Sequence, residues 1–271
     1  MQAGKVWLIG GTSDSATIAK ILVESEMPLV ITVTTATAQA LYVYRAEVVV
    51  GCMSLIEMGC FCQHHQIKVV IDASHPYATQ VSQQAIALTR KLNIPYLRYE
   101  RHHYQPFSVK RQDSEVIEVA SFQHLLAGDY LTAQRVLLTV GCNALPKFQS
   151  WQHKATLFAR VLPKIKSLEM AIASGFTGDR LIALRPPISA AMEAALWQQW
   201  DISLVVTKAS GNAGGEDTKR QVAASLGIPL IVIPRPQMIY PKKTFAIADI
   251  LPFCKLALSS RFQTENFGTV N

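Results

Sequence analysis

The sequence has no long apolar run and few cysteines. Its longest aliphatic runs, such as 69–71 and 230–233, are far shorter than the ~20 residues that a membrane-spanning helix needs. A secretory leader is not expected either, because Gly10-Gly11-Thr12 interrupts the apolar stretch near the N-terminus. The 5 cysteines are an odd number without the spacing of a disulfide framework, which suits a reducing compartment. We therefore expect a cytoplasmic protein with no membrane partner.

A lysine- or arginine-rich block is also missing, although the net charge is +7. The charges are dispersed, with one local concentration at Arg98, Arg101, Lys110 and Arg111. A nucleic-acid-binding protein more often has a basic stripe with aromatic residues between the charges, so no nucleic-acid partner is expected. Dispersed positive charge attracts any small anion, and a polycarboxylate or a phosphorylated molecule fits equally well. A monomer and a homodimer both remain open.

A metal site is not expected. Cys60, Cys62, His64 and His65 do lie close together, but in one predicted helix over 54–65. A closed zinc site collects its ligands from two chain segments with longer spacings. Buried thiols beside solvated histidines are the favoured interpretation.

Aliphatic runs alternate with helical stretches along the whole chain, which is typical of βα units and parallel sheets. Strands are predicted near 5–9, 29–34, 46–50, 68–71, 95–99, 115–119, 135–139, 156–161, 180–184, 202–206 and 229–233. Helices are predicted near 13–25, 54–65, 77–92, 121–128, 143–150, 164–174, 189–199, 216–226 and 246–258. The fold class is therefore α/β, with two Rossmann-like domains whose mostly parallel sheets face a central cleft.

The domain boundary is predicted in the aperiodic stretch after Glu100. We expect a Rossmann-like domain over 1–100, a linker over 101–113, a second α/β domain over 114–258 and a polar tail over 259–271. A chain of 271 residues with 49% hydrophobic residues is long enough for two cores of this size.

The first strand runs directly into Gly10-Gly11-Thr12-Ser13 and a helix. This arrangement presents backbone N–H groups to a phosphate in nucleotide-binding domains. The usual G-x-G-x-x-G is reduced to a glycine pair, so a structural turn between strand and helix is an equal alternative.

Thr34 and Thr35 follow the second strand, where an NAD site usually has an acidic residue for the ribose hydroxyls. Threonine hydroxyls donate to a phosphate without adding negative charge, which favours NADPH over NADH. The alternative is that threonine is simply a good residue at a strand end.

The passage Asp72-Ala73-Ser74-His75-Pro76-Tyr77-Ala78 follows another apolar strand. Ser74 or His75 is expected to cap a helix that Pro76 begins. His75 then lies at the mouth of the sheet, where it can donate to a carboxylate or polarise a ring.

In the second half, three strand ends carry candidate ligand-binding residues. Gly141 follows one strand in a turn that holds an anion or is a plain turn, and Arg160 either pairs with a substrate carboxylate or solvates an edge. Lys208, Ser210 and Gly211 open a glycine-rich loop before a helix, which combines a cation with exposed N–H groups. Hydrolase and P-loop motifs are absent, because there is no G-x-S-x-G elbow and no Walker spacing.

The order of these motifs resembles the precorrin-6A reductase family of cobalamin biosynthesis, from about residue 5 to 236. The specific parts are Asp72 to Ala78 and the K-x-S-G loop at Lys208 to Gly211. The resemblance implies an NADPH-dependent oxidoreductase, with NADH possible, that reduces one double bond of metal-free or cobalt-bearing precorrin-6A to precorrin-6B.

The resemblance also implies roles for the candidate residues. The cofactor is expected at Gly10, Gly11, Thr12, Ser13, Thr34, Thr35 and Ser74. The polycarboxylate macrocycle is expected at Arg98, Arg101, Gly141, Arg160, Ser210 and Gly211. His75, Tyr77, Lys208 or water supplies the proton that accompanies the hydride.

Two passages depart from the family pattern. Arg185-Pro186-Pro187 stands where a Gly-Pro-Phe-like turn is more common, and Ser13-Asp14-Ser15 stands where a glutamate and an arginine are common. Either change alters the cofactor geometry or marks a branch with a modified substrate. The alternative function is a non-catalytic protein that holds a tetrapyrrole or a nucleotide.

Overall fold

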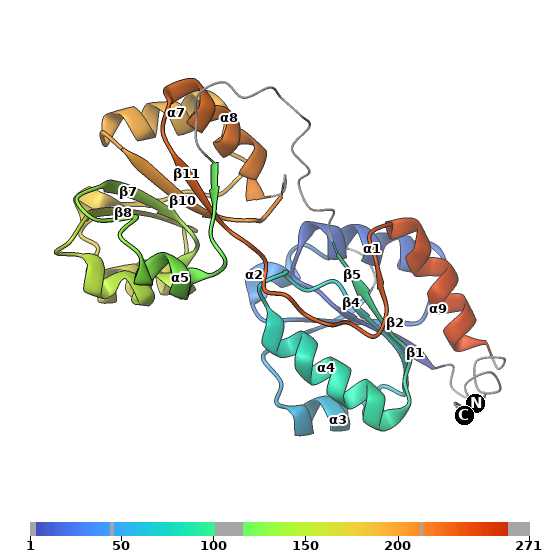
Figure 1. Ribbon diagram of the computed structural model, residues 1–271. Coiled ribbons are helices and arrows are strands. Elements are labelled where there is room, and N and C mark those ends of the chain that lie inside the picture. Colours follow the sequence, from blue (N-terminus) through green and yellow to red (C-terminus); the bar gives the residue numbers. More distant parts are fainter. Residues whose placement is uncertain (1–3, 44–45, 101–115, 212–213, 260–271) are drawn as a thin grey trace, which may run out of the picture. The chain divides into compact units, whose positions relative to one another are not determined.

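The computed structural model describes residues 4–43, 46–100, 116–211 and 214–259 (Figure 1). These residues form two compact units. Unit 1 contains 4–100 together with 236–259, and unit 2 contains 116–235. Within these residues no helix is long and apolar enough to span a bilayer.

Unit 1 is a six-stranded sheet of order β12-β5-β4-β1-β2-β3, in which every pair is parallel. Its strands are β1 (Lys5–Ile9), β2 (Leu29–Val33), β3 (Glu47–Val50), β4 (Ile67–Asp72), β5 (Tyr96–Tyr99) and β12 (Lys243–Thr244). Its helices are α1 (Ser13–Glu24), α2 (Ala36–Gln39), α3 (Leu55–His64), α4 (Thr79–Leu92) and α9 (Ile250–Leu258), preceded by the 3-10 turn η4 (Ile247–Asp249).

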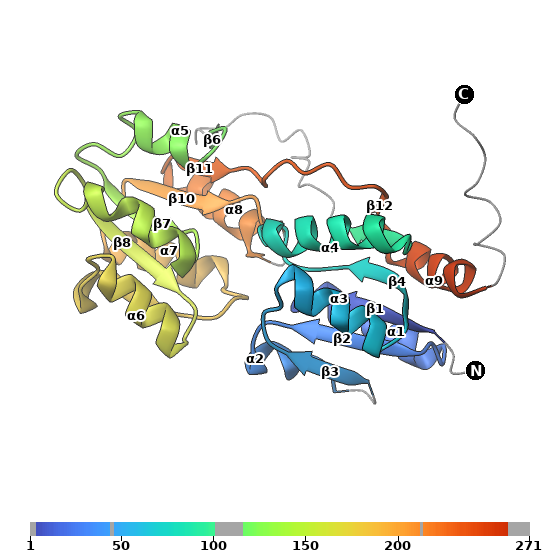
Figure 2. The same cartoon turned by 90° about the horizontal axis from the view of Figure 1, so that it is seen from below.

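Both faces of this sheet are buried. Val6 and Leu8 of β1 pack with α1 and α9, whereas Trp7 and Ile9 pack with α3 and α4 on the opposite face (Figure 2). Because successive side chains of a strand point to opposite faces, a continuous apolar strand needs helices on both sides. The βα alternation of the sequence supplies them.

Unit 2 repeats this architecture with a sheet of order β6-β11-β10-β7-β8-β9, also parallel throughout. Its strands are β6 (Val116–Glu118), β7 (Arg135–Thr139), β8 (Thr156–Val161), β9 (Leu181–Ala183), β10 (Leu204–Lys208) and β11 (Leu230–Ile233). Its helices are α5 (Phe122–Ala127), α6 (Ile165–Ala173), α7 (Ala190–Gln199), α8 (Glu216–Leu226) and the 3-10 helices η1 (Cys142–Trp151) and η2 (Gly178–Arg180). One core lies under α5, η1 and α6, and the other under α7 and α8.

The sequence prediction of an α/β fold with parallel sheets is confirmed. Three local features differ from it. The stretch 143–150 is a 3-10 helix, because Pro146 lies inside it and lacks the N–H that a regular α-helix uses. The short elements α2 and β12 were not predicted, since four and two residues are too short to show a hydrophobic period.

The predicted second domain over 114–258 also differs from the structure, which groups Pro236 onward with unit 1. The reason is that β12 pairs with β5 at the edge of the first sheet, and Ile250, Phe253 and Cys254 of α9 are buried in its core. The predicted linker over 101–113 lies outside the described residues.

Candidate functional site

The strand order of unit 1 brings the glycine pair and the Asp72 passage to one edge of the sheet. Ile9 at the end of β1 is in register with Asp72 at the end of β4, while β2 lies on the other side of β1. Ligands of open parallel sheets bind beyond the carboxyl ends of strands at such a switch in strand order. This edge is therefore the candidate site of unit 1.

The turn after β1 is held by a capping box. The Thr12 hydroxyl accepts from the Ser15 N–H at 3.1 Å, and the Ser15 hydroxyl accepts from the Thr12 N–H at 2.9 Å. The Thr12 hydroxyl also donates to the carbonyl of Ala73 at 3.0 Å, which ties the β1 turn to the β4 turn. Thr12 is buried, so its role is to fix the turn, whereas Ser13 beside it is exposed.

The two glycines are needed for different reasons. A Cβ at Gly10 would lie 2.2 Å from the Tyr42 hydroxyl oxygen. Gly11 has a φ of +104°, which side chains rarely adopt, and no atom lies within 4 Å of where its Cβ would be. Gly11 therefore leaves open space on the exposed side of the turn, where a ligand can approach the backbone closely.

Thr34 and Thr35 are both exposed after β2. The Thr35 hydroxyl accepts from the Ala38 N–H at 3.2 Å and so caps α2. No Asp or Glu occurs between Thr34 and Val43, so this strand end carries no negative side chain.

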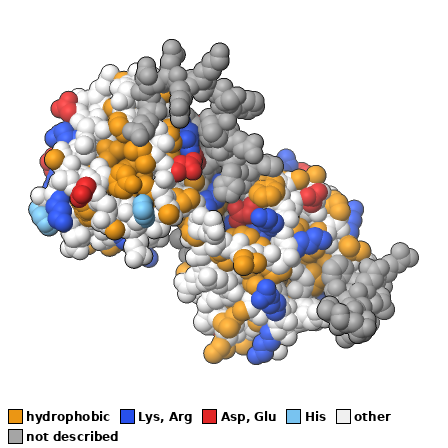
Figure 3. Space-filling view, in the orientation of Figure 1, with side chains coloured by type: hydrophobic (Ala, Val, Ile, Leu, Met, Phe, Trp, Pro, Cys, Tyr) orange, Lys and Arg blue, Asp and Glu red, His pale blue; other side chains and the backbone are white. Residues whose placement is uncertain are grey.

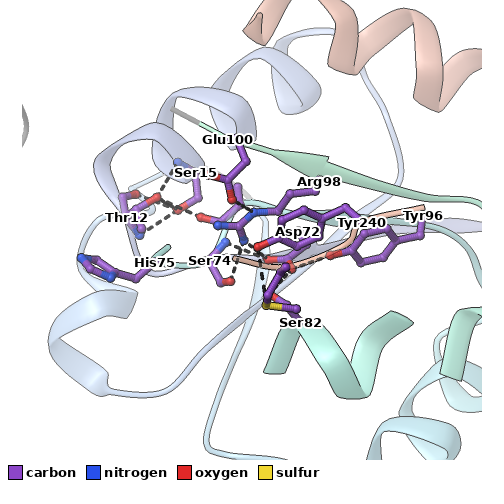
Figure 4. Close-up of polar contacts among 12 residues, drawn as sticks. Thr12, Ser15, Asp72, Ser74, His75, Ser82, Tyr96, Arg98, Glu100 and Tyr240 are labelled. Carbon is purple, nitrogen blue, oxygen red and sulfur yellow. Dashed lines mark hydrogen bonds and ion pairs between the residues drawn. The ribbon is translucent and has the colours of Figure 1, made fainter. Parts of the chain in front are cut away.

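A buried polar cluster underlies the β4 turn (Figure 4). The Asp72 carboxylate accepts from the hydroxyls of Ser82 at 2.5 Å and Tyr96 at 2.7 Å. It also accepts from the Ser74 N–H at 3.0 Å and from the guanidinium of Arg98 at 2.7 Å. Each oxygen of this fully buried carboxylate thus accepts two hydrogen bonds, which offset the cost of burying its charge.

Arg98 bridges two carboxylates. Its Nε donates to Glu100 at 2.7 Å, its Nη1 donates to Asp72 and to the Ser74 hydroxyl, and Tyr240 lies against its guanidinium, 5.3 Å from ring centroid to Cζ. Burial alone would lower the pKa of Arg98, yet the two carboxylates hold it above its usual value. Arg98 stays cationic at every ordinary pH.

The same environment shifts the acidic groups of the cluster. Burial alone would raise the pKa of Asp72, but the charge of Arg98 and the hydrogen bonds from Ser74, Ser82 and Tyr96 together hold it below its usual range. Burial raises the pKa of Tyr240 to about 12, although Arg98 acts in the opposite direction. Near neutral pH, Asp72 is therefore ionised, and Arg98 and Tyr240 keep their protons.

The structure corrects the predicted roles of two residues. Arg98 was expected to meet a substrate carboxylate, but its side chain is 1% exposed and engages internal carboxylates. Ser74 was expected to contact the cofactor, but its side chain is buried and its hydroxyl accepts from Arg98. Arg101 lies outside the described residues.

His75 is exposed and points away from the buried cluster in Figure 4. Its Nδ1 accepts from the backbone N–H of Tyr77 at 3.3 Å, so the neutral imidazole carries its proton on Nε2. The expected helix cap at Ser74 or His75 is wrong. The helix begins at Thr79, because the 76–78 stretch forms a turn closed by the Ala78 N–H to the carbonyl of His75 at 2.7 Å.

In unit 2 the corresponding switch in strand order lies between β7 and β10. Thr139 and Thr207 are in register there, so the turn at Gly141 and the loop that begins at Lys208 leave the same edge. Gly141 has a φ of +80° and open space around its missing Cβ. The Lys208 ammonium lies 5.7 Å from the centre of the Phe122 ring, and burial lowers the pKa of Lys208.

Ser210 and Gly211 lie in the loop that follows Lys208. The Ser210 hydroxyl lies against Gly214, where a Cβ would approach it to 2.0 Å. The Gly211 N–H donates to the buried carboxylate of Glu216 at 2.9 Å. The Gly211 amide therefore shapes the loop, and does not extend toward a ligand.

Arg160 is engaged within the protein. It is 8% exposed and donates to Glu193 at 2.5 Å, while the other oxygen of Glu193 accepts from the Trp197 indole at 3.1 Å. The expectation that Arg160 pairs with a substrate carboxylate is therefore corrected, because a carboxylate of the protein already occupies it. A buried arginine without a partner would be costly, and Glu193 supplies the partner.

The sequence motifs did not identify Lys219 as a buried charged residue of α8. It is 2% exposed and donates to the carbonyls of Gly214 at 2.8 Å and Gly215 at 3.0 Å. Burial and the nearby charge of Arg160 lower the pKa of Lys219 to about 8. The available signal was its spacing, because Lys219 lies three and four residues before Val222 and Ala223 on the buried face of α8.

The described residues carry positive charge on more than one part of the surface. On the face drawn in Figure 3, Lys and Arg side chains are scattered among apolar and uncharged ones. Among the described residues no group of three or more His, Cys, Asp and Glu side chains is placed to hold a metal ion.

Comparison with known proteins gives consistent matches. A family model described as precorrin-6x reductase CbiJ/CobK matches residues 5–255. A cobalt-precorrin-6A reductase of Synechocystis is 44% identical over 257 residues, covering 94% of this chain and 97% of that protein. One from Priestia megaterium is 31% identical over 244 residues, covering 87% and 92%. A solved structure named CobK precorrin-6A reductase matches with a TM-score of 0.74 at 21% identity, covering 94% of this chain and 97% of that one, which supports the fold.

Proposed function

Because the chain belongs to the precorrin-6x reductase family of cobalamin biosynthesis, we propose that it reduces one C=C bond of cobalt-precorrin-6A with NADPH. The family is one of oxidoreductases that act on a C=C group, and a reduced nicotinamide is its hydride source. The choice of the cobalt-bearing macrocycle follows the names of the two relatives that are 44% and 31% identical.

The carboxyl ends of the strands in unit 1 carry groups that fit a dinucleotide. Gly11 leaves its backbone accessible, and Ser13 is exposed at the first position of α1, where a helix amide has no partner inside the helix and the helix dipole favours an anion. Thr34 and Thr35 offer exposed hydroxyls at the end of β2 without a negative charge. An acid-free strand end accepts the 2′-phosphate of NADPH, whereas an NADH site uses a carboxylate there. This acid-free end is the observation that carries the choice of NADPH.

When bound, the reduced nicotinamide supplies a hydride. The residues at the end of β2 would hold the adenosine half of the dinucleotide, and those after β4, His75 and Tyr77 among them, would hold the nicotinamide half. The Nε2–H of His75 is our choice for the proton that completes the reduction, because Nδ1 is held by the Tyr77 amide. Tyr77 thus fixes the tautomer of His75 through its backbone.

Unit 2 supplies the groups for the acidic macrocycle. Lys208 and the open backbone at Gly141 share one sheet edge, and Lys208 offers a cation at the end of β10. A partly buried ammonium binds a carboxylate more strongly than an exposed one does, because water screens the charge less. Ser210 offers a hydroxyl two residues further along the same loop.

The test is anaerobic incubation of the purified protein with metal-free or cobalt-bearing precorrin-6A and either NADPH or NADH. Oxidation of NADPH with the cobalt-bearing substrate is expected, with a lower KM than for NADH. A flat NADPH absorbance trace with both macrocycles, from a protein that still binds them, would support the alternative of a non-catalytic binding protein.

A further inference from the structure

Tyr42 occupies the inner side of the glycine turn. The residue is 7% exposed and belongs to the core that contains Val6, Leu8 and Ile31. Its hydroxyl oxygen lies 2.7 Å from the Gly11 nitrogen and 2.7 Å from the Ser15 hydroxyl oxygen. A tyrosine between β2 and β3 thus reaches the turn that follows β1.

The direction of the hydrogen bond between Tyr42 and Ser15 follows because each hydroxyl has one proton to donate. The Ser15 hydroxyl donates to the Thr12 carbonyl at 2.7 Å, so it accepts from Tyr42. The Tyr42 oxygen in turn accepts from the Gly11 N–H. One directed chain therefore runs from the Gly11 amide through Tyr42 and Ser15 to the Thr12 carbonyl.

The amides that a glycine turn usually offers to a phosphate all donate within the protein here. The Gly10 N–H donates to the Thr32 carbonyl at 2.9 Å, the Gly11 N–H to Tyr42, and the Thr12 N–H to Ser15. The first residue of the segment whose amide faces the open end of the helix is Ser13. A phosphate would therefore be bound by the amides at the start of α1, because the Gly11 amide is already bonded to Tyr42.

The position of Tyr42 depends on α2. The Thr35 hydroxyl caps this helix at Ala38, and the Tyr42 N–H then donates to the Gln39 carbonyl at 3.0 Å. Thr35, the N-cap of α2, thus directs the chain so that Tyr42 returns to the turn. Gly10 leaves room for it, since any Cβ there would meet the Tyr42 oxygen at 2.2 Å.

We propose that Tyr42 is a positioning residue for the dinucleotide, whose hydroxyl locks the glycine turn in the conformation that presents Ser13 and the start of α1 to the phosphate. This inference rests on the proposed function. Without the hydroxyl, the Gly11 amide and the Ser15 oxygen lose their partner, and the turn populates other conformations. The apparent affinity for the cofactor then falls with the fraction of molecules in the competent conformation.

The experiment compares the wild type with Tyr42→Phe, and with Tyr130→Phe of unit 2 as the matched control. Binding of NADPH is titrated by its fluorescence, and KM and kcat are measured separately. For Tyr42→Phe we expect Kd and KM for NADPH to rise about tenfold, which corresponds to about 1.4 kcal/mol, with kcat and the substrate KM nearly unchanged. Tyr130→Phe should match the wild type.

A second measurement does not depend on activity. Gly10→Ala should lower the melting temperature of the wild type more than that of Tyr42→Phe, because the atom nearest to the new Cβ is then the ring carbon at 3.0 Å. Ser15→Ala should raise the NADPH Kd in the same direction as Tyr42→Phe. It covers the case in which Tyr42→Phe does not fold.

The outcomes separate this inference from the proposed function. A wild type that binds neither NADPH nor NADH overturns both. A wild type that binds NADPH, together with a folded Tyr42→Phe protein that binds it equally well or more tightly, overturns the role of Tyr42 alone. Tighter binding would mean that the hydroxyl blocks the Gly11 amide from the phosphate.

Discussion

The guanidinium of Arg98 donates to the carboxylate of Asp72 at 2.7 Å, and both side chains are almost completely buried. Asp72 ends β4 and Arg98 lies in β5, so the pair joins two neighbouring strands of the sheet at the candidate site. Ser74, one residue before His75, donates its N–H to Asp72 and accepts a hydrogen bond from Arg98 with its hydroxyl. The position of the His75 loop therefore depends on this ion pair.

We predict that Arg98→Met destabilises unit 1 by roughly 3–5 kcal/mol, because it leaves the carboxylates of Asp72 and Glu100 buried without their cation. Lys20→Met is the control, since the pair of Lys20 with Glu24 is exposed and worth at most about 0.5 kcal/mol. Hydrogen exchange of the β4 and β5 amides measures the effect. If Arg98→Met kept the amide exchange rates of the wild type but had a raised substrate KM, the substrate-binding interpretation of Arg98 would be restored.

Acid should weaken unit 1 through Asp72. The pKa of this group lies below its usual value in the folded protein, so its ionisation contributes stability above the unfolded pKa of ~3.9. That contribution is lost as the pH falls through this value toward the folded pKa. In unfolding curves between pH 5 and 2, the wild type should therefore lose stability more steeply than Asp72→Asn, which has no such carboxyl. If both proteins lost stability equally between pH 5 and 2, the lowered pKa of Asp72 would be contradicted.

The buried ammonium of Lys219 predicts the opposite dependence in unit 2. Its pKa of about 8 in the folded protein lies below the 10.5 of an ordinary lysine, so the unfolded chain binds more protons between these values. The stability of unit 2 should therefore rise as the pH increases from about 8 to 10.5. Hydrogen exchange of α8, corrected for the intrinsic pH dependence, should show the rise in the wild type and not in Lys219→Met. The control variant Lys20→Met should show the same rise in stability as the wild type.

The fold could be read from the sequence because both sheets consist of apolar strands bounded by glycine turns and amphipathic helices. The strands at Lys5–Ile9 and Thr156–Val161 lie where the pattern placed them. The return of the chain to unit 1 could not be read, since β12 has two residues and its pairing with β5 is long-range.

The candidate site was predictable in its location and less so in the roles of its charged residues. Gly11, His75 and Lys208 could be predicted as candidate site residues from their positions at strand ends, without any knowledge of contacts. Arg98 and Arg160 were expected to face a substrate, because the sequence shows a cation at a strand end and not its internal partner. Buried carboxylates such as Asp72 and Glu193 supply those partners, and one signal was available, since a charge within an apolar strand must be paired.

Lys208 should affect substrate binding and leave cofactor binding unchanged. Lys208→Ala is expected to raise the substrate KM by at least about tenfold, because it removes a charge-assisted hydrogen bond worth roughly 1.5–3 kcal/mol, while Lys208→Arg keeps the charge and most of the affinity. Burial lowers the pKa of Lys208, so the wild-type substrate KM should begin to rise at a lower alkaline pH than that of Lys208→Arg. Both are measured by steady-state kinetics with NADPH saturating. An unchanged substrate KM in a folded Lys208→Ala protein would argue against this role.

The cysteines allow a test that requires no turnover. Cys52 and Cys60 are exposed and should react with iodoacetamide in the native protein, as mass spectrometry of peptides would show. Cys62 and Cys254 are buried, and burial raises the pKa of Cys62 to about 11 and that of Cys254 to about 12, so both should react only after unfolding.

Cys142 is the informative thiol. It is partly exposed directly after Gly141, at the edge of unit 2 where the macrocycle is proposed to bind. Bound macrocycle should therefore slow the alkylation of Cys142 and leave the rates of Cys52 and Cys60 unchanged. Protection of Cys52 or Cys60, with no protection of Cys142, would place the macrocycle away from the β7 and β10 strand ends and would reassign the substrate site to unit 1.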